Sequence, residues 1–281
     1  MGVPVVGTIH HPITMDKRID IKHAETLSLK LLKWRWYSFL KMQIKVARKL
    51  DPIIVVSENT RKDVVKDFKI DPKKTRKVLH GIDHKTFEPI PSIERKKNQL
   101  ITTASADVPL KGLIYLIRAY SKLLNEFPDL SLVVIGKLRD GPTSNELDKK
   151  DIKNKVKFIS DLTSREIAEL YAESTIAISP SVYEGFGFPA GEAMSCGIPL
   201  ISTNGGSLPE VVGNSGIIVP HSNPNELRKA IKELLLSPEK RKELGEKGRK
   251  RVLEKFTWKR AAKELVEVYR EAISNADNRS R

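Results

Sequence analysis

The sequence predicts an α/β fold in which parallel sheets are built from alternating strands and helices. Two observations lead to this prediction. Short apolar runs rich in β-branched residues alternate with stretches of helical character along most of the chain, and glycine-rich loops follow several of these runs. Alternation at this spacing is typical of parallel βαβ units, which wind into a doubly wound domain.

The first part of the chain contains three expected strands, at residues 3–9, 52–56 and 77–79. Between the first two lies one long helical stretch over residues 24–50, and Ser57 is placed to cap a helix over residues 58–68. Three strands are too few for a sheet that is covered on both faces. We therefore expect residues 1–92 to form a partial N-terminal domain, which ends in a charged, apolar-poor linker.

The remaining part contains six expected strands, at residues 100–104, 130–135, 156–159, 176–179, 199–203 and 216–219. Helices are expected after them at residues 112–126, 164–173, 189–195 and 208–212. Asn223-Pro224-Asn225-Glu226 and Ser237-Pro238 are helix starts, a last helix runs from 257 to about 272, and residues 139–142 are expected in a polar loop. Six strands are enough for a complete Rossmann-like domain over residues 93–256.

The chain has 281 residues and a net charge of +15, from 50 basic and 35 acidic side chains. Such an excess is typical of proteins with an anionic partner, such as nucleic acid, an acidic membrane surface or a phosphorylated substrate. Nucleic acid ranks low because no sheet motif with stacking aromatic residues is present. Only two glutamines occur, and this depletion fits the Lys/Glu-rich surface of a hot-growing organism. That explanation of the positive charge is compatible with an anionic partner.

The sequence shows neither an apolar run of about 18 residues, long enough to span a bilayer, nor a secretory signal. Cys196 is the only cysteine, which excludes an internal disulfide and a metal cluster of several cysteines. We expect a cytoplasmic location.

The most informative stretch lies between Pro180 and Glu210. Two carboxylates, Glu184 and Glu192, bracket a glycine-rich loop that opens a short helix. Bare backbone amides, acidic groups and a helix N-terminus in one small volume suit a polyhydroxylated ligand that carries phosphate. The stretch therefore predicts a nucleotide-sugar site.

Several groups of residues resemble glycosyltransferase family 4, the retaining enzymes of the GT-B fold. They are Thr8-Ile9-His10, Gly81-Ile82-Asp83 with Phe87 and Pro89, Pro109-Leu110-Lys111-Gly112, and Glu184 to Glu192 followed by Pro199 and Gly205-Gly206-Ser207-Leu208-Pro209-Glu210. Thr257-Trp258 is similar to the family's closing helix. The resemblance implies a GT-B-like fold, with a complete C-terminal and a partial N-terminal Rossmann-like domain, and with residues 257–281 as a helix that crosses back to the N-terminal part.

The resemblance also implies a nucleotide-sugar donor and a glycan or lipid-linked acceptor. Lys111 would hold the diphosphate together with Ser105 and Gly112, and Glu192 would accept hydrogen bonds from the ribose hydroxyls. The residues implied to contact the sugar are Glu184, Gly185, Phe186, Gly187, Phe188 and His10. Among all of these, the resemblance gives catalytic roles to Glu184, Lys111 and His10, where Glu184 would orient the sugar and support developing positive charge.

Each of these side chains also has a plain structural interpretation. Lys111 can be a solvated surface lysine, Glu192 can complement the dipole in the first turn of its helix, and His10 can bond to backbone at the end of a strand. The strand–loop–helix context favours the functional interpretation for Lys111. For the two adjacent histidines, we favour function at His10 and structure at His11.

Three departures from the family pattern stand out. The chain begins where the N-terminal domain would be half built, so the rival expectation is a non-catalytic nucleotide-sugar-binding remnant, or a subunit that needs a partner. Where the family usually has an arginine, this chain has Ser105 and Ala106, and Lys137 or Arg139 could replace the missing cation. Where the family commonly has an asparagine, this chain has His80. Because no Asp-x-Asp pair occurs, we expect no metal and no other cofactor.

Residues 27–50 carry seven basic side chains and no acidic one, interleaved with aromatic residues. The basic residues are Lys30, Lys33, Arg35, Lys41, Lys45, Arg48 and Lys49. Such a helix can lie on an anionic membrane surface, which would make the protein peripheral on the inner membrane face. The alternative is a domain helix with its apolar side on the partial sheet and a solvated basic back.

Overall fold

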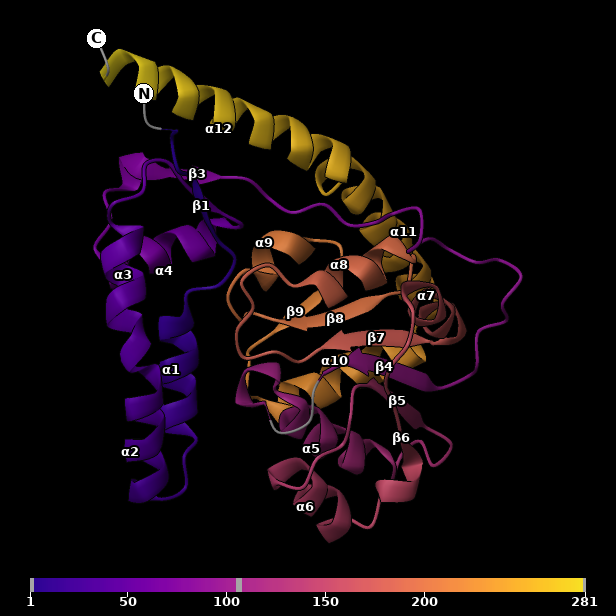
Figure 1. Ribbon diagram of the computed structural model, residues 1–281. Helices are drawn as coiled ribbons and strands as arrows, with labels where there is room; N and C mark the ends of the chain where they lie inside the picture. Colours follow the sequence, from indigo (N-terminus) through magenta and orange to yellow (C-terminus); the bar gives the residue numbers. More distant parts are fainter. Residues whose placement is uncertain (1–2, 105–107, 280–281) are drawn as a thin grey trace. The chain divides into compact units, whose positions relative to one another are not determined.

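The computed structural model describes residues 3–104 and 108–279, and the chain forms two compact units (Figure 1). One unit comprises Met1–Gly81 with Trp258–Arg281, and the other comprises Ile82–Thr257. The first division precedes the position expected at residue 92, because the segment after Gly81 already belongs to the larger unit. Ile82 donates a backbone hydrogen bond of 2.7 Å to the carbonyl of Phe256.

The larger unit contains a six-stranded parallel sheet in the order β6-β5-β4-β7-β8-β9. Its strands are β4 (Gln99–Thr103), β5 (Ser131–Ile135), β6 (Val156–Ile159), β7 (Ile176–Ser179), β8 (Leu200–Thr203) and β9 (Ile217–Val219). All six expected strands are confirmed. The order is that of the Rossmann fold, in which the chain winds outward in both directions from the two central strands.

Helices cover both faces of this sheet (Figure 1). On one face α5 (Leu113–Leu123) and α10 (Pro224–Leu236) bury Ile117 and Ile231 against Leu100, Val134 and other strand residues. The other face carries α7 (Ser164–Glu173), α8 (Phe188–Ser195) and α9 (Leu208–Val212), while α11 (Pro238–Lys255) packs beside α8. Strands covered on both sides explain the nearly continuous apolar runs of the sequence.

Local chemistry sets the ends of these helices as expected. Gly197 has a φ of 68° just after α8, and Asn223 caps α10 by accepting from the amides of Asn225 and Glu226. The prediction of a loop over residues 139–142 is wrong at its last residue, because α6 (Pro142–Lys149) begins at Pro142. Proline suits a first helical position, since its missing N–H needs no partner there.

The smaller unit contains a three-stranded parallel sheet of β1 (Gly7–Ile9), β2 (Ile53–Val55) and β3 (Thr75–Lys77). The expectation that three strands could not be covered on both faces is wrong. Ile53 and Val55 pack against α3 (Leu40–Ala47) and α4 (Glu58–Phe68), whereas Ile54 packs against Val268 of α12 (Trp258–Arg279). A helix from the far end of the chain therefore supplies the second cover.

The single helix expected over residues 24–50 is also wrong. The chain forms α1 (Ile13–Lys22), α2 (Leu27–Trp36), a 3₁₀ turn and then α3. Thr26 starts α2 by accepting from the amide of Leu29, and Tyr37 ends it, buried with its hydroxyl 2.8 Å from a carboxylate oxygen of Asp20. The helix propensity of the sequence was apparent, but these tertiary contacts were not.

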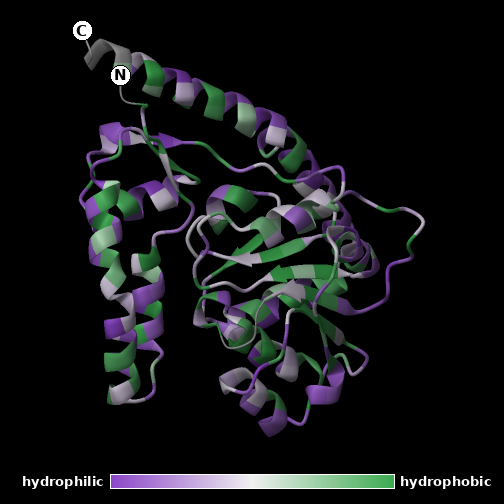
Figure 2. Cartoon of the chain, in the orientation of Figure 1, coloured by the Kyte–Doolittle hydropathy of each residue, from purple (hydrophilic) through white to green (hydrophobic). Residues whose placement is uncertain are grey.

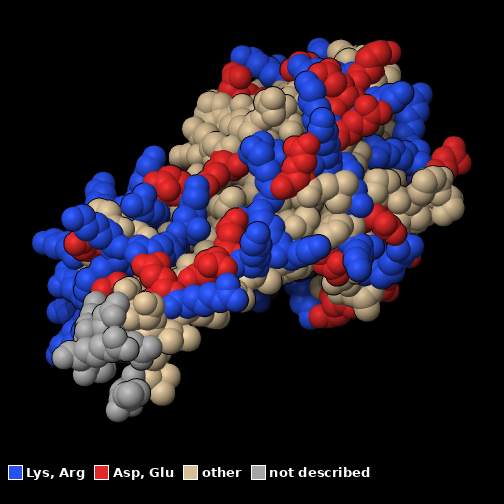
Figure 3. Space-filling model, turned by 90° about the horizontal axis from the view of Figure 1, so that it is seen from above, with Lys and Arg blue, Asp and Glu red and all other residues tan. Residues whose placement is uncertain are grey.

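Helix α2 has no buried side chain, although hydrophobic residues lie along it (Figure 2). Lysine and arginine cover much of the face drawn in Figure 3, with acidic side chains between them. Within the described residues, none of the helices combines the length and the apolarity that crossing a membrane requires.

Candidate functional site

The loops after β4 and β7 meet at the carboxyl end of the larger sheet, where the strand order reverses. In doubly wound sheets this switch point is where ligands bind. The two loops are joined directly, since the amide of Val182 donates to the carbonyl of Leu110 at 2.7 Å. Parallel pairing of β4 with β7 thus brings together two motifs that lie about 70 residues apart in the chain.

Three glycines allow this close approach. A Cβ on Gly112, whose φ is 63°, would lie 2.1 Å from the carbonyl oxygen of Pro180. A Cβ on Gly206, whose φ is 61°, would lie 2.3 Å from the carbonyl oxygen of Glu184, and a Cβ on Gly205 would lie 2.6 Å from that of Ser181. A side chain at any of the three positions would collide with backbone, and the positive φ of Gly112 and Gly206 disfavours other residues as well.

Lys111 and Glu184 form an ion pair at the centre of the site. The Lys111 Nζ donates to Glu184 Oε1 at 2.8 Å, and the Ser181 hydroxyl donates to the same oxygen at 2.7 Å. The side chain of Glu184 is 13% exposed and that of Lys111 33%. An ammonium group has three donors, so two remain available on Lys111 for a phosphate. Oε2 of Glu184 likewise has no hydrogen bond among the described residues.

Glu192 lies in the second turn of α8, since the helix begins at Phe188 rather than at the expected Pro189. The interpretation of Glu192 as a first-turn dipole partner is therefore wrong. Burial raises the pKa of this carboxyl to about 7, and among the described residues it has no hydrogen-bond partner. A half-buried acceptor without a partner is costly to the fold, so it suits a ligand that supplies donors.

Tyr171 borders Glu192, whose charge is one of the causes that raise the tyrosine pKa. Its hydroxyl lies 3.2 Å from Thr103 Oγ1, at the end of β4, and donates to the carbonyl of Pro189 at 3.3 Å. Sequence reasoning missed Tyr171 and Ser181, because neither type is distinctive at its position. Only the pairing of distant segments reveals them.

The loop of Gly185 to Phe188 has two different faces. Phe186 is buried, with its ring against those of Phe188 and Phe256, and its carbonyl accepts from the Ser207 hydroxyl at 2.8 Å. Phe188 is 38% exposed. Gly187 adopts a φ of 97° as the residue that precedes α8. The Phe186 side chain therefore anchors the loop, and the backbone around it is what the loop can offer to a ligand.

In the smaller unit, His10 pairs with His80. The Nδ1 of His10 lies 3.0 Å from the Nε2 of His80, and the rings are stacked with centroids 5.0 Å apart. Burial, with a smaller effect of His10, lowers the pKa of His80 to about 4. The partner of His10 is thus a neutral side chain rather than backbone. His11 bonds to Asp16, in line with its structural interpretation.

Other expected residues lie apart from this geometry. Ser105 and Ala106 fall outside the described residues. Lys137 pairs with Asp161 at 2.9 Å, so its charge is already shared with an acid. Among residues 3–104 and 108–279, no group of three or more His, Cys, Asp or Glu side chains is arranged to hold a metal ion.

Comparisons with known proteins agree with the motifs. Residues 85–251 match the family described as glycosyl transferases group 1, and residues 1–86 match Glycosyltransferase Family 4.

Two curated relatives illustrate the range of similarity. The MMP alpha-(1->4)-mannosyltransferase of Mycolicibacterium hassiacum is 39% identical over 278 residues, covering 98% of this chain and 67% of the relative. The D-inositol 3-phosphate glycosyltransferase of Streptomyces bingchenggensis is 29% identical over 79% of this chain and 53% of its own length. The chain thus spans between about half and two thirds of the length of these relatives.

Solved structures share the fold at low identity. Sucrose-phosphate synthase from Thermosynechococcus elongatus has a TM-score of 0.78 at 22% identity, covering 96% of this chain and 68% of that one. Anabaena HepE in complex with UDP and glucose has a TM-score of 0.77 at 17% identity, covering 94% and 70%. The expected GT-B-like α/β fold is confirmed. Both family matches and the mannosyltransferase relative show that the chain belongs to glycosyltransferase family 4.

Proposed function

We propose that the chain transfers a sugar, with retention, from a nucleotide-sugar donor to a hydroxyl acceptor. The observation that carries this proposal is the Lys111–Glu184 ion pair, which lies at the sheet's switch point with Glu192 on the helix that follows. A cation that keeps two donors, a carboxylate with a free oxygen and a second, unpartnered carboxylate match a diphosphate, a sugar and a ribose diol.

In this proposal Lys111 stabilises the negative charge that develops on the departing diphosphate. The bond between the anomeric carbon and the diphosphate oxygen breaks, and the bond from the acceptor oxygen to the same face of that carbon forms. The acceptor proton passes to the departing phosphate oxygen, so atoms and charge balance without a covalent sugar intermediate. A fixed cation in a site with little water is worth several kcal/mol to such a step, and no metal is required.

The relatives favour this chemistry. One is named as a mannosyltransferase and another as a glycosyltransferase of inositol phosphate, and the HepE structure holds UDP and glucose. A hexose donor and a hydroxyl acceptor, on a glycan or on a lipid-linked molecule, are therefore our proposal for this chain.

Two substitutions separate transfer from binding. We expect Glu184→Ala to abolish transfer and Glu192→Ala mainly to weaken donor binding, with Glu169→Ala on the exposed side of α7 as the control. Binding of UDP, GDP and ADP by calorimetry identifies the base, and a transfer assay with the matching sugar donors gives turnover. Full turnover in Glu184→Ala would remove the assignment.

A second candidate function is nucleotide-sugar binding without transfer, or transfer that needs a separate polypeptide. It rests on the place of Lys111, Glu184 and Glu192, which all belong to the unit Ile82–Thr257, so that this unit would supply these nucleotide contacts by itself. Nucleotide binding by the wild-type chain without turnover in any donor and acceptor combination would favour it. Turnover by the purified chain alone would reject it.

We further propose that the α1–α2 hairpin contacts an anionic membrane that carries the acceptor. The alternative, an apolar side packed on the sheet, applies to α3, whereas α2 leaves Trp34 and Trp36 59% and 73% exposed. A cavity of about 640 Å³ is bordered by α1, α2 and α3, and its lining includes Lys17, Arg18, Lys22, Lys41 and Trp34. Cations beside interfacial aromatic rings suit a lipid phosphate.

Flotation with phosphatidylglycerol vesicles tests this contact. We expect the wild-type chain to float and a Trp34→Ala/Trp36→Ala variant to remain with the free protein, while phosphatidylcholine vesicles retain neither. Trp258→Ala, which removes a 50% exposed indole outside the hairpin, is the matched control. Equal flotation of all variants would contradict the proposal.

A further inference from the structure

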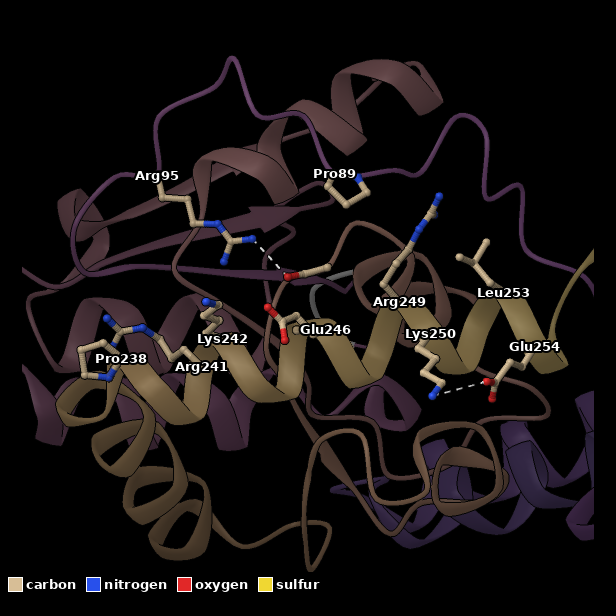
Figure 4. A pocket seen from close by; sticks show the side chains of 12 residues that line it. Pro89, Arg95, Pro238, Arg241, Lys242, Glu246, Arg249, Lys250, Leu253 and Glu254 are labelled. Atoms are coloured by element: carbon tan, nitrogen blue, oxygen red, sulfur yellow. Dashed lines mark hydrogen bonds and ion pairs between the residues drawn. The ribbon is translucent and has the colours of Figure 1, made fainter.

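The larger unit contains a second cavity, of about 700 Å³, at the opposite edge of its sheet from the donor site. Lys111 and Glu184 follow the carboxyl ends of β4 and β7. The second cavity instead includes Gly197, which lies between the end of α8 and the beginning of β8, and one face of α11 (Figure 4). No motif of the donor site contributes to it.

Positive charge dominates this cavity. Arg95 extends from the segment before β4 toward Lys242 and Glu246 of α11, whereas Arg241, which also lines the cavity, extends toward Pro238 (Figure 4). Among residues 3–104 and 108–279, Arg95 and Arg241 donate hydrogen bonds only to backbone carbonyls, at Gly197 and at the end of α10. Within the described residues, none of these cations has a carboxylate at ion-pair distance, although Glu246 lines the same cavity.

The other charged groups of the lining are already used. Arg249 donates to the backbone carbonyls of His84 and Phe87 and to Ser195, which fixes it as a structural residue. Lys250 lies 3.9 Å from Glu254. Arg249 thus has four acceptors, whereas Arg241 has two and Arg95 has one, and Lys242 has none among the described residues.

The charges of Arg95 and Arg241 repel each other. Burial and the neighbouring charge of Arg241 both lower the pKa of Arg95, which means that the folded chain holds these charges together at a cost. A bound anion would remove this repulsion. Guanidinium groups present paired donors that match phosphate oxygens, and the ammonium group of Lys242 adds a third, flexible donor.

We propose that this cavity binds a small molecule that carries two phosphoryl groups, held by Arg95, Arg241 and Lys242. The volume is in the range of small-molecule sites, and Pro89, Pro238 and Leu253 offer apolar wall for the rest of the ligand. The site is distinct from the donor site and does not depend on the proposed transfer reaction.

Inorganic pyrophosphate is the probe, and Lys111→Gln is the background because we expect it to weaken pyrophosphate binding at the donor site. Calorimetric titration of this variant should show one binding site. Adding Lys242→Gln or Arg95→Gln should weaken binding about tenfold each, the usual effect of losing one hydrogen bond to a charged group. Thermal unfolding confirms that each variant is folded.

The matched control is Lys255→Gln, which removes the same charge from the end of the same helix outside the cavity. Absence of binding in the Lys111→Gln chain, or equal weakening by Lys255→Gln and Lys242→Gln, would overturn the proposal. Flotation with vesicles that contain cardiolipin, a lipid with two phosphate groups, distinguishes a lipid headgroup from a free metabolite as the source of phosphate. A lipid headgroup is supported as the ligand if the chain floats with the vesicles and if both Lys242→Gln and added pyrophosphate abolish this flotation. Pyrophosphate binding without flotation would support a free metabolite.

Discussion

Glu192 is predicted to destabilise the fold in order to bind a ligand. Burial raises the pKa of its carboxyl from 4.5 to about 7. Each pKa unit equals about 1.4 kcal/mol, so the ionised carboxylate lowers the free energy of unfolding by at most roughly 3 kcal/mol at alkaline pH. Glu192→Gln keeps the shape and removes the charge. We therefore expect the variant to be more stable than the wild type by about 1–3 kcal/mol at pH 8.

The sign of the pH dependence follows from proton binding. Between about pH 4.5 and 7 the unfolded state has lost its proton at this position while the folded state keeps it, so the stability contributed by this group falls as pH rises. The stability difference between Glu192→Gln and the wild type should thus be small at pH 4.5 and reach its full size above pH 7. Urea unfolding followed by circular dichroism at several pH values measures it, and subtraction cancels the other titrating groups.

Donor binding should show the opposite trend, because only the ionised carboxylate accepts from both ribose hydroxyls. With a pKa of about 7, the dissociation constant for the nucleotide should be about tenfold higher at pH 6 than at pH 8. In Glu192→Gln this change should be absent once the titration of the ligand itself is subtracted. If Glu192→Gln is no more stable than the wild type at pH 8, and if its nucleotide binding keeps the same pH dependence, Glu192 is neither a destabilising carboxylate nor the group that binds the ribose.

Metal removal, two glycines, His80 and Arg249 each give a further prediction. Treatment with EDTA should leave transfer unchanged, as measured by turnover with and without added Mg²⁺; loss of activity would contradict the role of the fixed cation. Gly206→Ala should reduce stability by well over 1 kcal/mol and abolish nucleotide binding, whereas Gly197→Ala, at a similar φ but with its nearest neighbour 3.4 Å from the new Cβ, should cost only about 1 kcal/mol and leave nucleotide binding intact. Because the pKa of His80 is lowered to about 4, the wild type should lose stability as pH falls from 6.5 to 4; His80→Asn should lose less, and identical acid unfolding curves would argue against a buried neutral imidazole. Arg249→Met should destabilise the larger unit by about 2–4 kcal/mol in urea unfolding, because the carbonyls it serves and Ser195 lose their donor; a change below 0.5 kcal/mol would show that water replaces it.

Much of the larger unit could be predicted from the sequence because its signals are local. Buried parallel strands read as short apolar runs, and capping residues such as Asn223 and Gly197 mark helix ends. The ion pair of Lys111 with Glu184 was also within reach, since both residues stand at the carboxyl ends of strands that a doubly wound sheet places side by side.

The parts that could not be predicted depend on tertiary contacts. The second cover of the small sheet comes from Val268, about 200 residues away in the chain, and no local pattern encodes that pairing. The helix expected over residues 24–50 is interrupted at Tyr37, which is buried and bonds to Asp20. The pairing of His10 with His80 likewise joins two residues that the sequence leaves far apart.

We propose that one ligand contacts Lys111, Glu184 and Glu192 together. Diffraction from crystals of the protein soaked with the nucleoside diphosphate that binds best in calorimetry tests it most directly. We predict diphosphate oxygens within hydrogen-bond distance of Lys111 Nζ, and ribose hydroxyls at the carboxylate of Glu192. Nucleotide density that avoids both residues, or that appears only in the cavity of Arg95 and Lys242, would contradict the account.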